Sequence, residues 1–182
     1  DHCNVANHGF RLLRESMECG LAQSLSSLLW AFARLSVSHK GIIDVACREA
    51  LSHLKASDHS TQELSVLAWA TAMLGVRNSE LSYALAEQAL LKIKAFTLQE
   101  FMLFAWGTVG TASNVELSRA IQDEVVLRLT MIDLHCCSEA AWRKLAKEVL
   151  GVVWAYNFLG CLRGDLRESA RRVLGQMGIA LD

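Results

Sequence analysis

One recurring motif limits the fold of this chain more than any other feature of its sequence. Residues 60–75 form a hydrophobic stretch with a polar start, a central Trp69 and a final glycine, and related stretches surround Trp30, Trp106 and Trp154. These four tryptophans are 39, 37 and 48 residues apart. A period of about 40 residues with two helices per period is typical of α-solenoids, in which stacked helical hairpins share one continuous core.

The residues around each tryptophan repeat as well. A large apolar residue stands five and two positions before each of the four rings, and a small residue, Ala or Gly, follows each of them. We interpret the four tryptophans as core residues, because they stand among Leu and Ala and because large aromatic side chains are usually buried. The alternative interpretation is that the rings are platforms on which the bases of a single-stranded nucleic acid stack.

The pattern predicts an all-α protein with one helical-repeat domain, residues 1–182, built as an α-solenoid of about four stacked helical hairpins. The predicted units are a partial repeat at 1–20, repeats at 21–57, 58–95 and 96–130, an irregular insertion at 130–137, and a last repeat at 138–178. The chain contains no proline, which favours helices joined by short turns because proline interrupts helices.

Local signals predict where several of these helices begin and end. Ser60 with Glu63, and Thr97 with Glu100, have the spacing of capping boxes, in which a hydroxyl and a carboxylate each bind an amide at the helix start. Helix starts are also predicted at Asn78 or Ser79, at Asn114 and at Ser138. Helix stops are predicted at Gly75 and Gly160.

An amide side chain stands seven residues before each of the first three tryptophans, as Gln23, Gln62 and Gln99. We interpret these glutamines as helix-capping and local hydrogen-bonding residues, because they occupy the first turn of the predicted helices. The alternative is that they contact base edges.

Overall charge gives no support for a dedicated nucleic-acid protein, because the formal net charge is −1. The distribution is uneven, however, and a C-terminal basic set stands out: Arg143, Lys144, Lys147, Arg163, Arg167, Arg171 and Arg172. The spacing of Arg163, Arg167 and Arg171 predicts that they share one helix face. This set is the candidate contact with phosphates or with an acidic partner, against the alternative of a solvated surface.

The repeat pattern resembles a known family. The string Gln-Glu-Leu-Ser-x-Leu-Ala-Trp-Ala-x-Ala-x-Leu-Gly at 62–75 is similar to the first helix of octotricopeptide repeats and of the helical-hairpin repeats found beside RAP domains in organellar proteins. The stretch at 28–35 is similarly close, and the resemblance extends over about 21–178. It implies a right-handed superhelix, a location in a chloroplast or mitochondrion, and a role in RNA processing, stability or ribosome association.

Two functions follow as expectations. The first is a non-catalytic helical-repeat module that binds organellar RNA through the C-terminal basic set. The second is a structural subunit of a large organellar assembly, such as a ribosome or a photosynthetic or respiratory complex, that binds protein rather than RNA. The chain begins at Asp1 rather than Met, so any targeting peptide lies outside this sequence.

Other classes of function have little support in the sequence. The longest uncharged run, residues 101–115, is shorter than the about 20 residues of a membrane span, so no span is expected. No motif of a nucleophilic, phosphate-binding or zinc-dependent enzyme occurs, so we expect no catalysis and no cofactor. The run at 135–137, His-Cys-Cys, lacks a second ligand pair, so no metal site is expected, and the six cysteines are expected to be reduced and buried.

Overall fold

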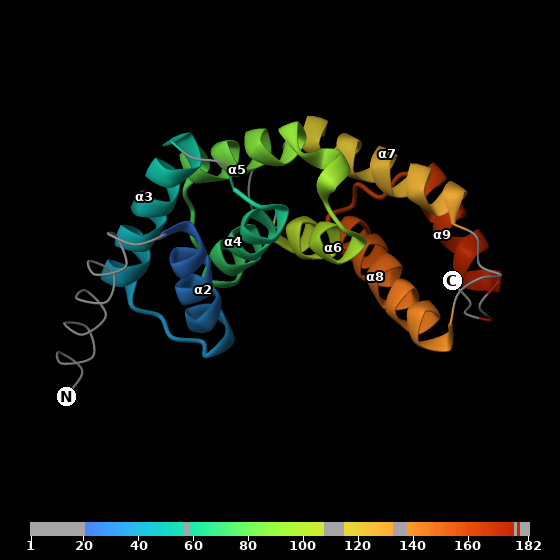
Figure 1. Cartoon of the computed structure of the whole chain (residues 1–182), viewed down its shortest axis with the longest axis horizontal. Coiled ribbons are helices and arrows are strands. Elements are labelled where there is room, and N and C mark those ends of the chain that lie inside the picture. The colour runs from blue at the N-terminus through green and yellow to red at the C-terminus, as the bar shows by residue number, and fades with distance from the viewer. Residues whose placement is uncertain (1–20, 57–58, 108–114, 133–137, 177, 179–182) are drawn as a thin grey trace.

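The computed structural model describes residues 21–56, 59–107, 115–132, 138–176 and 178. These residues form eight α-helices and one short 3₁₀ helix, with no strand among them, so the prediction of an all-α protein is confirmed (Figure 1). The predicted partial repeat at 1–20, the helix start at Asn114 and the run at 135–137 lie outside the described residues.

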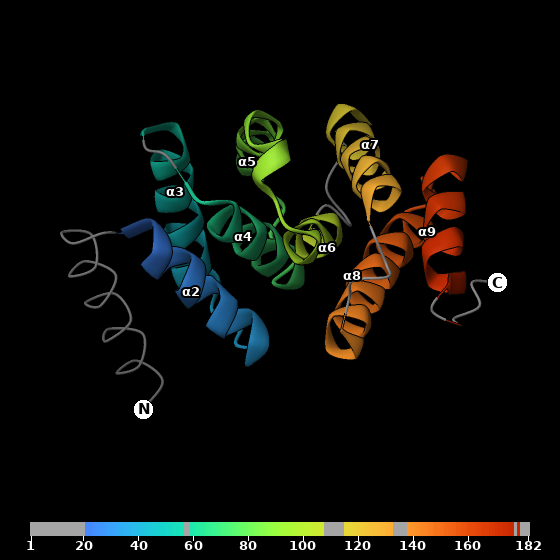
Figure 2. The ribbon, with the colours of Figure 1, turned by 45° about the vertical axis from the view of Figure 1, so that its right-hand side comes forward.

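The helices alternate between two layers along the chain. The layer on the inside of the arch in Figure 1 contains α2 (Leu21–Arg34), α4 (Thr61–Met73), α6 (Leu98–Gly107) and α8 (Glu139–Phe158). The outer layer contains α3 (Lys40–Ala56), α5 (Ser79–Leu91), α7 (Val115–Met131) and α9 (Gly164–Gln176). Successive helices within each layer contact one another, and the inner helices do so more extensively, which matches the curvature of the arch (Figures 1 and 2).

The capping residues that the sequence predicts do begin helices. At α4, the Ser60 amide donates to the Glu63 carboxylate at 2.9 Å and the Glu63 amide donates to the Ser60 hydroxyl at 3.2 Å. Thr97 and Glu100 make the same reciprocal pair at 2.7 and 3.2 Å. Asn78 caps α5 and Ser138 caps α8. Both predicted capping boxes are therefore confirmed.

Three inner helices end in the same backbone turn. The residue six positions after the tryptophan has a positive φ in each, namely +53° at Ser36, +66° at Gly75 and +68° at Gly160. In each turn the next amide donates to the carbonyl five residues before it, as from Val37 to Phe32 at 2.9 Å. This is the Schellman arrangement, so the two predicted glycine stops are confirmed. Ser36 adopts the conformation without being glycine.

Replacing Ser36 with Gly should raise the free energy of unfolding by about 0.5–1 kcal/mol, because the left-handed conformation is unfavourable for a residue with a Cβ. Glycine also has more conformational freedom in the unfolded chain, but this offsets only part of the gain in stability. Chemical denaturation of the two proteins measures the difference. The control is Ser27→Gly on the exposed side of α2, where the same substitution should lower stability by about 0.5 kcal/mol because glycine disfavours helix. A loss of stability in both variants would contradict the prediction.

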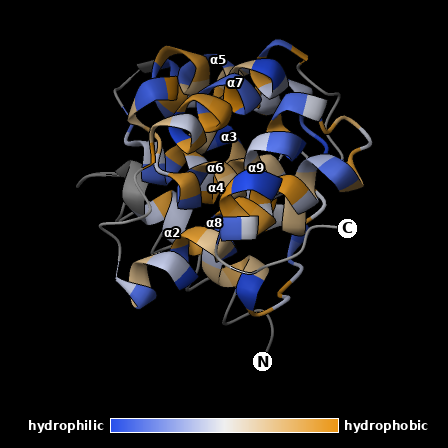
Figure 3. Ribbon diagram, turned by 90° about the vertical axis from the view of Figure 1, so that its right-hand side faces the viewer, coloured by the Kyte–Doolittle hydropathy of each residue, from blue (hydrophilic) through white to orange (hydrophobic). Residues whose placement is uncertain are grey.

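The core lies between the two layers and uses the predicted repeat positions. The large apolar residues five positions before the tryptophans are all buried: Leu25, Leu64, Phe101 and Val149. Of the small residues that follow the tryptophans, Ala70, Gly107 and Ala155 are buried. Figure 3 shows hydrophilic and hydrophobic residues interleaved along α9, which buries one side only.

The interpretation that the tryptophans are core residues is wrong for Trp30 and Trp154 and holds only in part for Trp69 and Trp106. Trp30 is 45% exposed and Trp154 is 69% exposed, while Trp69 and Trp106 are half-buried against the edge of the core. With about 3.6 residues per turn, positions five before and one after a residue lie on the side of the helix away from it. The position five before is buried in all four helices and the position after is buried in three of them, from which we infer that the rings face the inside of the arch.

Two further expectations need correction. Helix α7 continues to Met131, so the first two residues of the insertion predicted at 130–137 are helical. Cys47 is buried, and burial raises the pKa of its thiol to about 11, but Cys161 is exposed. The other four cysteines lie outside the described residues. No described helix combines the length and the apolar character that crossing a bilayer requires.

Candidate functional site

The structure distributes the C-terminal basic set over two layers. Arg143, Lys144 and Lys147 lie on the inner helix α8, whereas the four remaining arginines lie on the outer helix α9 or directly before it. The set therefore does not form one helix face. Every member of the set except Arg163 is exposed.

Most of this positive charge is already paired within the chain. Arg143 contacts Glu139 at 2.6 Å, Lys144 lies 3.9 Å from Glu148, and Arg171 lies 3.4 Å from Glu168. Exposed pairs of this kind contribute only about 0–1 kcal/mol to stability. They still place a carboxylate beside each cation, which weakens the attraction of the set for phosphate.

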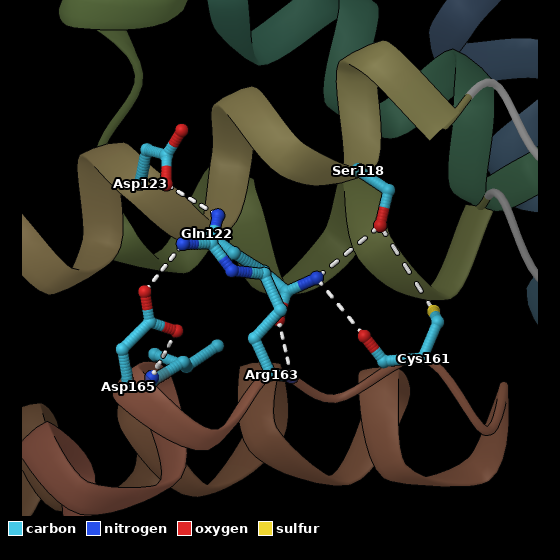
Figure 4. Close-up of polar contacts among 7 residues, drawn as sticks. Ser118, Gln122, Asp123, Cys161, Arg163 and Asp165 are labelled. Atoms are coloured by element: carbon cyan, nitrogen blue, oxygen red, sulfur yellow. Dashed lines mark hydrogen bonds and ion pairs between the residues drawn. The ribbon is translucent and has the colours of Figure 1, made fainter.

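Two arginines of the set bind groups of α7 and so link it to α9 and to the residue before α9. The guanidinium of Arg163 pairs with Asp123 of α7 and with Asp165 (Figure 4). The hydrogen bond to Asp123 raises the pKa of Arg163 above its usual value. Arg172 donates to the carbonyl of Leu129 at 2.7 Å. Arg163 stands before α9 and its guanidinium contacts α7, so the prediction that three arginines share one helix face holds only for Arg167 and Arg171.

A buried glutamine joins α7 to the turn between α8 and α9. Gln122 accepts a hydrogen bond from the Arg163 amide at 2.9 Å, and it donates to the Cys161 carbonyl at 3.2 Å and to the Ser118 hydroxyl at 3.3 Å (Figure 4). The side chain is buried, so these bonds satisfy groups that water does not reach. The sequence signal for this contact is a polar residue next to Ile121 within the buried stripe of α7.

Replacing Gln122 with Ala should lower the free energy of unfolding by about 2 kcal/mol, because the amide of Arg163 and the carbonyl of Cys161 lose their buried partner. Denaturant titration followed by circular dichroism measures the change. The matched control is Gln99→Ala, whose side chain is exposed and whose loss should change stability by less than about 0.5 kcal/mol. Equal stability of the two variants would show that the buried bonds contribute little.

The second candidate surface is on the inside of the arch. We define the inner-face aromatic row as the four tryptophans that occupy equivalent positions on the four inner helices: Trp30, Trp69, Trp106 and Trp154. The helices that carry them contact each other in sequence, α2 with α4, α4 with α6, and α6 with α8. The row therefore crosses the inner layer from one end to the other.

One helical turn later, the inner helices expose a second set of side chains. Met73 is 61% exposed and Phe158 is 71% exposed. The ring of Phe158 lies 6.1 Å from that of Trp106, so the two sets form one continuous surface where α6 meets α8. At the other end, the guanidinium of Arg34 lies 5.8 Å from the ring of Trp30.

Two of the three glutamines before the tryptophans are exposed, and other residues supply the helix caps. Glu63 and Glu100 supply the capping side chains, and Gln62 and Gln99 are exposed beside them. The interpretation of these two glutamines as capping residues is therefore wrong. The side chain of Gln23 lies outside the described set.

The two central helices of the inner layer carry no cation, because α4 and α6 contain no Lys or Arg. Their two carboxylates take part in the capping boxes, and Glu100 also accepts from the Thr61 hydroxyl at 3.2 Å. The cations of the inner layer stand at its two ends, on α2 and α8.

In the part of the chain that the structure describes, no group of three or more His, Cys, Asp or Glu residues is placed to hold a metal ion. Comparison with known proteins found no matching family model, no matching curated protein and no matching solved structure. The function must therefore be argued from the surfaces themselves.

Proposed function

We propose that this chain is a non-catalytic helical-repeat binding module that holds a protein partner in a large assembly, and that the partner binds on the inside of the arch. The proposed architecture is a right-handed α-solenoid of about four stacked helical hairpins. Its support is the alternation of inner and outer helices and the shared turn at Ser36, Gly75 and Gly160. The handedness and an organellar location rest on the resemblance to octotricopeptide repeats.

The observation that carries the preference for protein over RNA is the composition of α4 and α6. A nucleic-acid strand carries one charge per nucleotide, and binding requires Lys or Arg near its phosphates. The two central inner helices have neither residue, and five of the seven members of the C-terminal basic set contact a carboxylate or a backbone carbonyl of this chain. Exposed aromatic and apolar side chains with few charges are instead typical of protein interfaces.

RNA binding remains the second candidate. Its support is the family resemblance, the four aromatic rings and the exposed cations Lys147 and Arg167, which make no ion pair with a described residue. Aromatic platforms combined with basic side chains bind single strands without strong sequence preference.

Site-specific photo-crosslinking tests the proposed function. A photoreactive amino acid at Met73, on the inner face, should form an adduct in an extract of cells that express the protein. The adduct should be destroyed by protease and resist ribonuclease. The matched control is the same amino acid at Tyr83, an exposed side chain of the outer helix α5, which should form little adduct.

An adduct that ribonuclease destroys would favour the second candidate instead. In that case, affinity for single-stranded RNA should fall steeply between about 50 and 200 mM salt. It should also fall when Arg167 and Arg171 are replaced with Ala. Equal crosslinking at Met73 and Tyr83 would contradict both forms of the proposal.

A further inference from the structure

We propose that the inner-face aromatic row binds an amphipathic helix of the partner protein, one with an apolar stripe along its length and acidic residues near both ends. This inference rests on the proposed function and names the chemistry of the partner. It follows from the apolar surface, its dimensions and the placement of its charges.

The apolar surface is continuous where α6 meets α8. Half-buried Met102, Leu103 and Leu150 lie on α6 and α8, the two helices that also carry the Trp106–Phe158 contact. Tryptophan and arginine side chains dominate the binding energy of many protein interfaces. Tryptophan buries a large area with little loss of conformational freedom. The large apolar residues that the outer layer exposes among the described residues are Tyr83, Leu91, Val115, Leu127 and Met131, and only Tyr83 of these is aromatic.

The dimensions of the row match one helix laid across the inner layer. Packed helices lie about 8–10 Å apart, so four of them present tryptophans over about 30 Å. In a partner helix, residues seven positions apart are separated by about 10 Å, and about 20 residues extend 30 Å. An apolar stripe with heptad-like spacing would therefore meet successive inner helices, which is the usual mode of helix recognition in a groove.

The cations at the two ends of the inner layer favour a partner helix with acidic residues near its ends. Arg34 lies beside Trp30 on α2, and Lys147 stands two turns before Trp154 on α8, while the helices between them carry no cation. A single-stranded nucleic acid would leave its central phosphates unmatched over α4 and α6. A bilayer surface is flat, whereas this surface is on the inside of an arch (Figure 1). A helix with an uncharged middle and carboxylates near its ends fits both the charge and the shape.

Designed peptides test this inference on the whole chain. The first peptide is a helix of about 20 residues with a Leu stripe, Glu near both ends and no tryptophan. The second has Lys in place of those Glu residues, and the third has the same composition with the stripe scrambled. Protein tryptophan fluorescence and titration calorimetry measure binding. The Glu-ended peptide should bind with a micromolar Kd, the Lys-ended peptide about tenfold more weakly, and the scrambled peptide without saturation.

Protein variants locate the bound peptide. The double variant Trp154→Ala with Phe158→Ala should bind the Glu-ended peptide at least about tenfold more weakly, because it removes two exposed rings of the proposed site. The double variant Tyr83→Ala with Leu127→Ala on the outer layer should bind unchanged. Lys147→Glu should reduce the preference for Glu over Lys ends, and Lys147→Arg should preserve it. Circular dichroism of each variant establishes that it is folded.

Three results would overturn the inference. The Glu-ended and Lys-ended peptides could bind equally, or the outer-layer variant could lose as much peptide affinity as the Trp154→Ala, Phe158→Ala variant. The third result is that no peptide with an apolar stripe binds saturably. Quenching of the tryptophans by a single-stranded RNA or by anionic phospholipid vesicles, without binding of the peptides, would overturn the inference as well. If the protein adduct at Met73 persists while no helical peptide binds, this inference fails and the proposed function stands. If the adduct is also absent, both fail.

Discussion

Replacing Phe101 with Ala should lower the free energy of unfolding by about 3–5 kcal/mol, the range expected when a fully buried aromatic ring is deleted. Phe101 is completely buried at the start of α6, where its ring stacks on Phe96 at 5.2 Å between centroids. The guanidinium of Arg128 lies 5.1 Å from the same ring. The substitution would leave a cavity in the core between the layers and remove both ring contacts.

The measurement is equilibrium unfolding in urea or guanidinium chloride, read by far-ultraviolet circular dichroism. The matched control is Trp154→Ala, which deletes a larger aromatic side chain from the inner face. Because that ring is mostly exposed, its loss should change stability by less than about 0.5 kcal/mol. The opposite order, with Trp154 more important than Phe101, would mean that the core does not lie where the structure places it.

Replacing Gly107 with Ala should lower the free energy of unfolding by about 3 kcal/mol, at the upper end of the usual effect of overpacking. A Cβ at this position would lie 2.5 Å from the carbonyl carbon of Ala68 and 2.7 Å from its oxygen. These are backbone atoms of α4, so the clash is relieved only by moving α6 away from α4. We expect the same movement to disturb the spacing of Trp69 and Trp106 in the inner-face aromatic row.

Two other glycines provide controls for this prediction. A Cβ at Gly151 would meet only the flexible side chain of Met102, so Gly151→Ala should cost less than Gly107→Ala. A Cβ at Gly175 of α9 would meet nothing, so Gly175→Ala should raise stability by up to about 1 kcal/mol through helix propensity. Thermal or denaturant unfolding should show that stability increases from Gly107→Ala through Gly151→Ala to Gly175→Ala. A Gly107→Ala protein as stable as the unmodified chain would refute the close approach of α4 and α6.

Short-range features of the sequence predict the helices and several of their ends, although not the end of α7. The Ser60–Glu63 box needs only residues within one helical turn, and a residue without a Cβ favours the left-handed turn at Gly75. The recurrence of apolar residues five positions before each tryptophan likewise identifies the buried stripe, because helical periodicity is a property of the chain itself. The all-α class follows from these signals.

Long-range packing determines which side of each inner helix faces the rest of the molecule. The sequence places tryptophan inside an apolar stripe that is wider than the buried one, and only the positions of α3, α5, α7 and α9 show which part of that stripe is covered. Long-range packing also determines the partners of Arg163 and Gln122, because these partners are about 40 residues away in the chain. A residue's neighbours along one helix specify its angular position, but its exposure depends on where the other helices pack.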